Sequence, residues 1–439
     1  MGTSTWSRIL FVFTSCLWIW LSLSPAYGQL QGKVNLVNSA CITLADSVSA
    51  GLLISDEIKI QKSEAAVAAE QYSAAKASVL PTIKASAAVL KQDNSKITSR
   101  AEPESYQTTA KVTLNQPLYA GGAEYAAIRK TSKQAEAGAK MADAARIKVI
   151  RDLTSSFFQV LSAQAELQSS AELRDVSKRR AKEIRARVGI GRSRAVDGLG
   201  ADAQLASSEA QYESSRLALD AAKRHLSSEI GREVQNVCDI SPKVNGHLKD
   251  WDDVRQKVQK RPDLAATDLA VSAAGDNVAI ARAGHQPSLE FGANYYVKRP
   301  ETQKTYGNWD VSLSASLPIY SGGMVGSKVN EALAVEQKQL SIARQLKQSA
   351  EDEARDLWES HVTGRTQVAS LEEASKKSSQ YYQAMANDER KGLASSLETL
   401  QALNASIDTL RAFQKAKLKF EETIRQLHLV TNDVEGALR

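Results

Sequence analysis

The stretch QPLYAGG, residues 116–122, returns as LPIYSGG at residues 317–323. Both copies contain the pattern Pro-x-Tyr-x-Gly-Gly, and the prolines Pro117 and Pro318 lie 201 positions apart. The same spacing continues downstream, where it relates Gly191 to Gly392, Asp197 to Glu398 and Leu226 to Leu427. The chain is therefore predicted to be a tandem duplication of a unit of about 200 residues, which is far longer than the repeats of solenoid proteins.

Ahead of each glycine turn, apolar and polar residues alternate in two short stretches. Residues 82–89 read TIKASAAV and residues 106–114 read YQTTAKVTL, and the second copy repeats the pattern at 288–297 and 309–317. A period of two over about ten residues is typical of a β-strand with one apolar and one polar face. Such strands occur both in ordinary half-buried hairpins and in transmembrane β-barrels.

The N-terminus has the features of a secretory signal. Arg8 precedes an apolar run over residues 9–23, and Ala-Tyr-Gly follows at 26–28. This order predicts a signal peptide at residues 1–28 that is cleaved from an exported chain. An uncleaved membrane anchor is the alternative, although the apolar run is short for a span. Cys16 lies inside the run without a lipobox, so we predict no lipid anchor.

Four matched strands in an exported chain favour a membrane barrel over a half-buried hairpin. In lipid every backbone polar group must be paired, so a sheet with open edges cannot stand alone. The smallest barrels have about eight strands, so four strands per chain require several chains to share one barrel. The loops near 94–103 and 299–305 lie between paired strands and are expected to face the cell exterior.

Long helical stretches follow each glycine turn. No proline occurs from residue 122 to 188 or from 323 to 391. Nearly 70 residues at about 1.5 Å each give about 100 Å, a length that requires coiled packing against other helices. Shorter helices are expected at 44–78, 194–230, 262–284 and 395–430, with a mixed, non-helical belt at 232–261. The predicted fold class is α+β, mostly α, with long tandem-repeat helices forming a coiled-coil barrel joined to a β-barrel.

The repeated motif fits the corner where a strand becomes a helix. Proline cannot donate to a sheet ladder, so each proline is expected to end a strand. The glycine pairs allow a sharp bend, and the tyrosines suit a membrane–water boundary. The residues expected to build the two corners are Pro117, Tyr119, Gly121, Gly122, Pro318, Tyr320, Gly322 and Gly323.

Composition and charge exclude several function classes. The chain has 439 residues and a net charge of +6, with basic and acidic residues mixed along its length rather than gathered as a nucleic-acid footprint. Its five histidines lack metal-ligand spacing, and no C-x-x-C or H-E-x-x-H motif occurs. We therefore predict no catalytic residues, no metal, no cofactor and no nucleic-acid partner.

The domain organisation follows from the duplication and the N-terminus. We expect a signal peptide at 1–28, a first repeat at 29–231, an equatorial linker at 232–261 and a second repeat at 262–439. Cys41 precedes the first helix and Cys238 follows the first repeat, so both should lie near the belt of an exported chain. These positions allow a disulfide in an oxidising compartment, with two free thiols as the alternative.

The combined pattern resembles the TolC family of outer-membrane export ducts. Pro-x-Tyr-x-Gly-Gly follows an alternating strand and precedes a long helix, and then comes Gly-x-x-x-x-[Val/Leu]-[Asp/Glu]-x-Leu, all in two copies. The resemblance covers residues 44–430. It implies a homotrimer with four strands per chain in one twelve-stranded transmembrane β-barrel set in outer-membrane lipid, and a helical tunnel in the periplasm.

The resemblance also implies a function. Such a chain is a passive conduit rather than an enzyme, and it is opened by a periplasmic adaptor (membrane fusion) protein and an inner-membrane ABC or proton-driven pump. Type I protein secretion and multidrug efflux look alike at this level. A periplasmic coiled-coil scaffold or adhesin without a pore is the alternative, and the four alternating strands count against it.

Residue by residue, the resemblance places two groups at the periplasmic end of the tunnel. The residues expected at the helix tips, where such ducts meet their adaptor, are Gly191, Arg192, Arg194 and Gly392. The residues expected at a narrow acidic entrance are Asp197, Glu398 and Gln401.

Glu398 has a competing structural role, because Ser395-Ser-Leu-Glu398 is a capping-box sequence. Asp197 has no Ser or Thr three residues before it, so it is the stronger candidate for a channel role.

Overall fold

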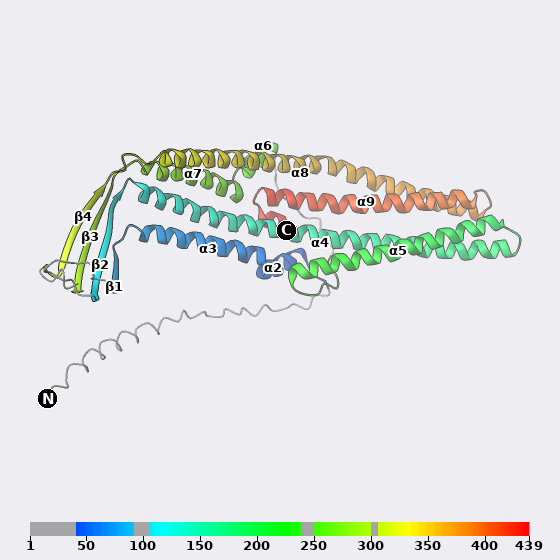
Figure 1. Cartoon of the computed structure of the whole chain (residues 1–439). Coiled ribbons are helices and arrows are strands. Elements are labelled where there is room, and N and C mark those ends of the chain that lie inside the picture. The colour runs from blue at the N-terminus through cyan, green and yellow to red at the C-terminus, as the bar shows by residue number, and fades with distance from the viewer. Residues whose placement is uncertain (1–40, 92–105, 239–249, 300–305, 439) are drawn as a thin grey trace, which may run out of the picture. The chain divides into compact units, whose positions relative to one another are not determined.

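The computed structural model describes residues 41–91, 106–238, 250–299 and 306–438. The predicted signal peptide at 1–28, Cys16 and almost all of the two predicted exterior loops lie outside these residues. Within them, about three-quarters of the residues lie in helices, most of them long, and the strands form one small sheet (Figure 1). The predicted α+β, mostly α class is confirmed.

The helices largely match the expected segments. Their bounds are α2 Leu44–Ile54, α3 Asp56–Ala77, α4 Ala123–Gly189, α5 Ala195–Ile230, α6 Trp251–Val258, α7 Pro262–Ala283, α8 Met324–Arg390, α9 Ser396–Val430 and α10 Val434–Leu438. Helices α4 and α8 each contain 67 residues, as the proline-free stretches predict. None of these helices combines the length and the apolar character that would let it cross a membrane.

Two helical expectations were wrong. The segment 44–78 is two helices, because Ser55 ends α2 in a non-helical conformation and its hydroxyl caps α3 by accepting from the Ile58 N–H at 3.4 Å. The belt at 232–261 is not entirely non-helical, since it contains α6. Asp250 caps this short helix by accepting from the Asp253 N–H at 2.9 Å.

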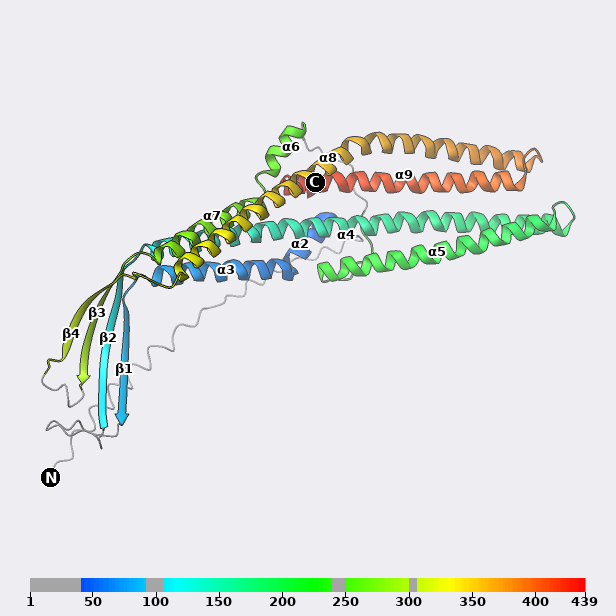
Figure 2. The same ribbon diagram turned by 45° about the horizontal axis from the view of Figure 1, so that its top comes forward.

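The long helices form two antiparallel hairpins. Helix α4 pairs with α5 and α8 pairs with α9, and the tips of both hairpins lie at the end of the helical body away from the sheet (Figure 2). Small residues allow close packing along α4 and α8, where Ala126, Ala181, Ala332 and Ala354 are buried. The duplicated sequence therefore produces two matching hairpins.

The four strands form one antiparallel sheet in the order β1-β2-β3-β4. Their bounds are β1 Thr82–Lys91, β2 Tyr106–Ala120, β3 Ser288–Lys298 and β4 Trp309–Ser316. The pairing of β2 with β3 joins the β-hairpin of the first repeat to the β-hairpin of the second. Among the described residues, β1 pairs only with β2 and β4 only with β3, so the sheet that these residues form is open at both edges.

The corner motif is largely as expected, with one correction. All four motif glycines have positive φ, for example +80° at Gly122 and +83° at Gly323, each of which immediately precedes a long helix. Pro318 lies beyond the end of β4, but Pro117 lies inside β2. The pairing register with β3 shifts between Pro117 and Tyr119, and a bulge of this kind tolerates a residue without an N–H.

The belt between the repeats contains a buried core and a covalent link. Val48, Phe157 and Leu226 belong to one core cluster, and Val254 and Leu427 belong to a second cluster around α6. A disulfide joins Cys41 to Cys238, whose Cα atoms lie 5.1 Å apart. Next to it, the Cys238 N–H donates to the Ile42 carbonyl at 2.9 Å. The start of the described chain is thus fixed to the end of the first repeat.

Candidate functional site

The sheet has two chemically different faces. Cross-strand pairing places Ile83, Leu114, Ala293 and Val311 in one apolar row, and a second apolar contact joins Phe291 to Leu313. Ile83, Val311 and Leu313 are 69%, 54% and 65% exposed, and Leu114, Phe291 and Ala293 are half-buried. One face of the sheet is therefore an exposed apolar surface that runs across all four strands.

The opposite face of the sheet is polar and internally hydrogen-bonded. Asn294 on β3 is its centre: its side-chain oxygen accepts from Thr113 at 2.8 Å and from Lys111 at 3.3 Å, and its amide donates to Asp310 at 2.8 Å. Arg299 adds an ion pair with Asp310 at 3.3 Å. An apolar and a polar face on one sheet are what a strand between lipid and a water-filled lumen requires.

The two hairpin tips have the same backbone geometry. Gly191 and Gly392 adopt φ values of +74° and +77°, which favour glycine. In the first tip the Arg192 N–H donates to the Arg187 carbonyl at 2.8 Å, and in the second the Leu393 N–H donates to the Asp388 carbonyl at 2.8 Å. Both turns are glycine C-caps that satisfy the last carbonyls of a long helix.

Glu398 completes the capping box that its sequence predicts. Its backbone N–H donates to the Ser395 hydroxyl at 3.2 Å, and its carboxylate accepts from the Ser395 N–H at 2.8 Å. The Ser395 N–H, followed by the Ser395 hydroxyl, which donates to the same carboxylate at 2.8 Å, holds the pKa of Glu398 below its usual value. Because the folded pKa is lowered, the stabilisation is present at neutral pH and is lost as the pH falls through that pKa.

Asp197 also caps its helix, contrary to expectation. Its carboxylate accepts from the Arg194 N–H at 3.1 Å and from the Arg194 guanidinium at 3.0 Å. The Arg194 side chain, followed by its backbone N–H, holds the pKa of Asp197 below its usual value. The N-cap residue here is Arg194, which supplies no acceptor of its own, so no Ser or Thr in the sequence marks this arrangement. Asp197 is thus partly neutralised within its own tip.

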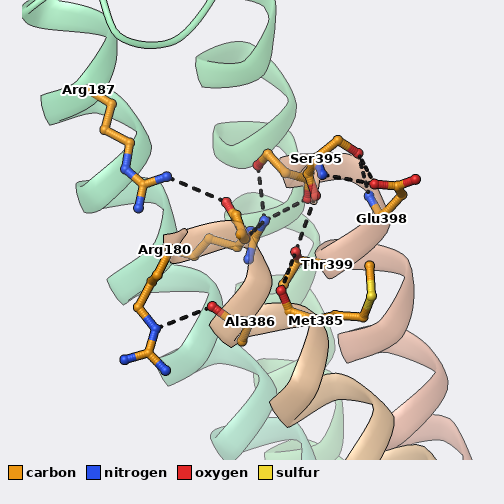
Figure 3. Close-up of polar contacts among 10 residues, drawn as sticks. Arg180, Arg187, Met385, Ala386, Ser395, Glu398 and Thr399 are labelled. Atoms are coloured by element: carbon orange, nitrogen blue, oxygen red, sulfur yellow. Dashed lines mark hydrogen bonds and ion pairs between the residues drawn. The ribbon is translucent and has the colours of Figure 1, made fainter. Parts of the chain in front are cut away.

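A largely buried contact near the tips joins the two repeats and was not predicted. The Arg180 guanidinium on α4 donates to the Glu389 carboxylate at 2.9 Å, to the Ser396 carbonyl at 2.6 Å and to the Ser396 hydroxyl at 3.0 Å (Figure 3). Arg180 and Glu389 are only 13% and 11% exposed. Arg187 lies 3.7 Å from the other oxygen of Glu389. We call this set of bonds the inter-hairpin tie.

A signal for Arg180 exists in the sequence. Ser177, Ala181 and Ile184 are the buried residues of this part of α4, and Arg180 lies on their helical face at a spacing of three to four residues from Ser177 and Ile184. An arginine on a packing face needs a buried partner. The partner itself could not be read from the sequence, since Glu389 lies 209 residues away.

The remaining predicted site residues lie around this tie. Arg192 and Arg194 are exposed at the first tip, and Gln401 is exposed on α9. A cavity of about 250 Å³ lies between α4, α5 and the start of α9, and Arg180, Arg194 and Asp197 help to line it. The structure therefore gathers the tip residues of the first repeat and the start of α9 into one region.

A profile of the outer membrane efflux protein family matches residues 52–232 and 254–433. The chain belongs to the outer membrane efflux protein family. Each of the two matched segments contains one hairpin of strands and one hairpin of long helices, so the family pattern follows the duplication. Membership of the outer membrane efflux protein family makes the chain an outer-membrane protein.

Curated relatives are similar over part of their length. The chain is 27% identical to the proteases secretion protein PrtF of Dickeya chrysanthemi over 276 residues, which cover 57% of this chain and 56% of PrtF. It is 23% identical to protein CyaE of Bordetella pertussis, over 53% of this chain and 51% of CyaE. The chain spans about half the length of these curated relatives.

Solved structures share the fold more completely. The CmeC outer membrane channel of Campylobacter jejuni superposes with a TM-score of 0.79 at 18% identity, over 89% of this chain and 86% of CmeC. The outer membrane protein VceC of Vibrio cholerae gives 0.77 at 19% identity, over 90% of this chain and 95% of VceC. The arrangement of paired long helices on a four-stranded sheet is thus the fold of outer-membrane channels.

Proposed function

We propose that three copies of this chain form a passive exit duct that crosses the outer membrane and extends into the periplasm. Each copy contributes four strands to a shared twelve-stranded barrel, and its α4/α5 and α8/α9 hairpins to a helical tunnel. A periplasmic adaptor protein and an inner-membrane pump, either an ABC transporter or a proton-driven pump, deliver the substrate. The chain is a conduit rather than an enzyme, and the pump selects between protein secretion and efflux of small molecules.

The observation that carries this proposal is the open, two-faced sheet. An exposed apolar face suits lipid, yet the unpaired edges of β1 and β4 cannot exist there. Pairing β4 of one copy with β1 of the next satisfies both edges and closes a ring. Twelve strands lie within the range of known membrane barrels, whereas the four strands of one chain do not.

The proposed organisation within each copy follows the duplication. Residues 29–231 and 262–439 are the two repeats, and 232–261 with α6 forms the belt between them. The disulfide between Cys41 and Cys238 secures the first repeat at this belt.

We infer that the inter-hairpin tie helps to keep the periplasmic entrance closed. It joins α4 to the end of α8 and the start of α9, so it resists separation of the two hairpins near their tips. A partner that opens the duct must break these bonds or move both hairpins together. Asp197 and Glu398 cap their helices at the same level and can still present charge to the entrance.

The test is conductance of the purified full chain in planar bilayers. We expect discrete single-channel steps, together with a mass close to three times that of one chain in detergent by mass photometry. A stable monomer, or a trimer that never conducts even after the tie is removed, contradicts the duct and favours a scaffold without a pore.

A further inference from the structure

The first hairpin tip carries a basic surface that the proposed tie does not use. We call it the first-tip basic face, and it consists of Lys178, Arg179 and Lys182 on α4 and Arg192 in the turn. All four side chains are exposed, and none forms an ion pair or a side-chain hydrogen bond with another described residue.

Neighbouring cations of the same tip are already partnered. Arg185 pairs with Asp202 at 2.7 Å, and Arg194 pairs with Asp197 at 3.0 Å. Within the described residues of this region, the unpartnered positive charge is therefore concentrated in the basic face. Two exposed acids lie close to it on α4: Glu183, and Asp175, which pairs with Arg174 at 2.8 Å.

The second tip shows that the hairpin does not need these charges. At a spacing of 201 residues, the four basic positions correspond to Ser379, Gln380, Gln383 and Leu393. The second tip nevertheless has the same glycine turn, the same closing hydrogen bond and a helix pair of almost the same length. The cations of the first tip therefore add a surface property rather than a requirement of the fold.

We propose that the first-tip basic face is a docking surface for an acidic segment of a periplasmic partner protein, and that the second tip takes no part in this charge recognition. The proposal rests on the proposed function, which puts both tips within reach of an adaptor or pump. Unpaired cations at a protein surface raise the rate of encounter with a complementary acidic surface and set its orientation.

The surroundings favour a protein over an anionic membrane. Ile190, Val196 and Leu199 are exposed beside the basic face. Exposed apolar side chains beside unpaired cations fit a protein interface, which combines an apolar core with a polar rim, whereas a layer of lipid headgroups would need only the cations.

The experiment replaces the four basic residues of the first tip by the residues found at the matching positions of the second tip, and this variant is called the graft. The variant combines Lys178→Ser, Arg179→Gln, Lys182→Gln and Arg192→Leu in the full chain. The matched control removes the same number of positive charges from the second tip, through Lys376→Gln, Lys377→Gln, Arg390→Gln and Lys391→Gln. Binding is measured by interferometry to a synthetic two-helix hairpin peptide with a row of glutamates, and to its glutamine twin.

The expected result is selective and salt-dependent. The unmodified chain should bind the glutamate peptide at least tenfold more tightly than the glutamine twin, and this preference should fall as salt rises from about 50 to about 300 mM. The graft should lose at least tenfold in affinity for the glutamate peptide. The control should stay within about twofold of the unmodified chain.

Three outcomes overturn the proposal. The graft binds the glutamate peptide as tightly as the unmodified chain, the control loses as much affinity as the graft, or the unmodified chain binds only vesicles containing phosphatidylglycerol. The last outcome assigns the face to a membrane. Conductance of the graft in planar bilayers separates this question from the duct itself, because a conducting graft without peptide binding keeps the duct and isolates the tip.

Discussion

Replacing Arg180 by glutamine is expected to make the entrance open more readily. The substitution removes the guanidinium that joins α4 to Glu389 and Ser396. Among the described residues, the carboxylate of Glu389, which is 11% exposed, would then keep Arg187, at 3.7 Å, as its one cationic neighbour. The Ser396 carbonyl would lose the same donor.

The size of the effect can be worked from the geometry. Two unit charges 2.9 Å apart attract by about 332/(20 × 2.9), or about 6 kcal/mol, at an effective dielectric constant of about 20. Desolvation of both groups offsets part of this, and removal of one partner of a buried pair costs about 3–5 kcal/mol. Because both side chains keep some exposure, we take the lower end of this range, about 3 kcal/mol, as the stabilisation of the closed state that the substitution removes. If the tie breaks on opening, the ratio of open to closed ducts should rise about a hundredfold.

Single-channel recording in planar bilayers measures this ratio without any partner protein. Arg185→Gln is the matched control, since Arg185 lies on the same helix and its partner Asp202 belongs to the same hairpin, with both side chains about half exposed. The control should change the open fraction by less than about fivefold, because exposed pairs are worth about 0–1 kcal/mol. Glu389→Gln added to Arg180→Gln should have little further effect. An open fraction for Arg180→Gln equal to that of the unmodified trimer would refute the gating role of the tie.

Three further predictions concern the sheet, the helix caps and the belt. Val112→Arg on the apolar face should lower the stability of the barrel by about 2–4 kcal/mol if the residue lies near the bilayer midplane, whereas Thr113→Arg on the polar face should be tolerated. The measurement is the temperature at which the trimer dissociates. Ser395→Ala should destabilise the tip by about 0.5–2 kcal/mol in thermal unfolding, whereas Glu398→Gln should be nearly silent there. If Glu398→Gln with Asp197→Asn also leaves the reversal potential under a salt gradient unchanged, the two acids are caps only. Cys41→Ser or Cys238→Ser should lower the free energy of unfolding in urea by about 2–5 kcal/mol. A urea midpoint that does not change when the disulfide of the unmodified chain is reduced would contradict this.

Much of the fold could be predicted because it rests on local patterns. The alternation in residues 82–89 and 106–114 specifies strands, and the absence of proline after residues 122 and 323 specifies two 67-residue helices. The glycine pairs mark both corners because positive φ suits glycine at each of them. These predictions are stronger than a single copy would allow, because every local signal occurs twice in the sequence.

The errors arose where local rules compete. Proline usually ends a strand, but the bulge at Leu118 allows β2 to continue through Pro117. The N-cap rule names Ser, Thr, Asp and Asn, so the reversed arrangement at Arg194 and Asp197 was missed. The inter-hairpin tie was missed for a different reason. It depends on how two hairpins pack, and no local pattern connects Arg180 to a glutamate 209 residues later.

The duplication also explains why the tie can exist only once per chain. At a spacing of 201 residues, Arg180 corresponds to Tyr381, and Glu389 corresponds to Val188. The reciprocal contact, from α8 of one copy to the α4/α5 hairpin of the next, would therefore place a tyrosine opposite a valine and could form no ion pair. In a ring of three copies, three junctions between hairpins would carry the tie and three would lack it. The tie would then hold the junction within each chain, while the junction between copies would lack this particular ion pair, so a partner that separates two copies would not have to break the tie.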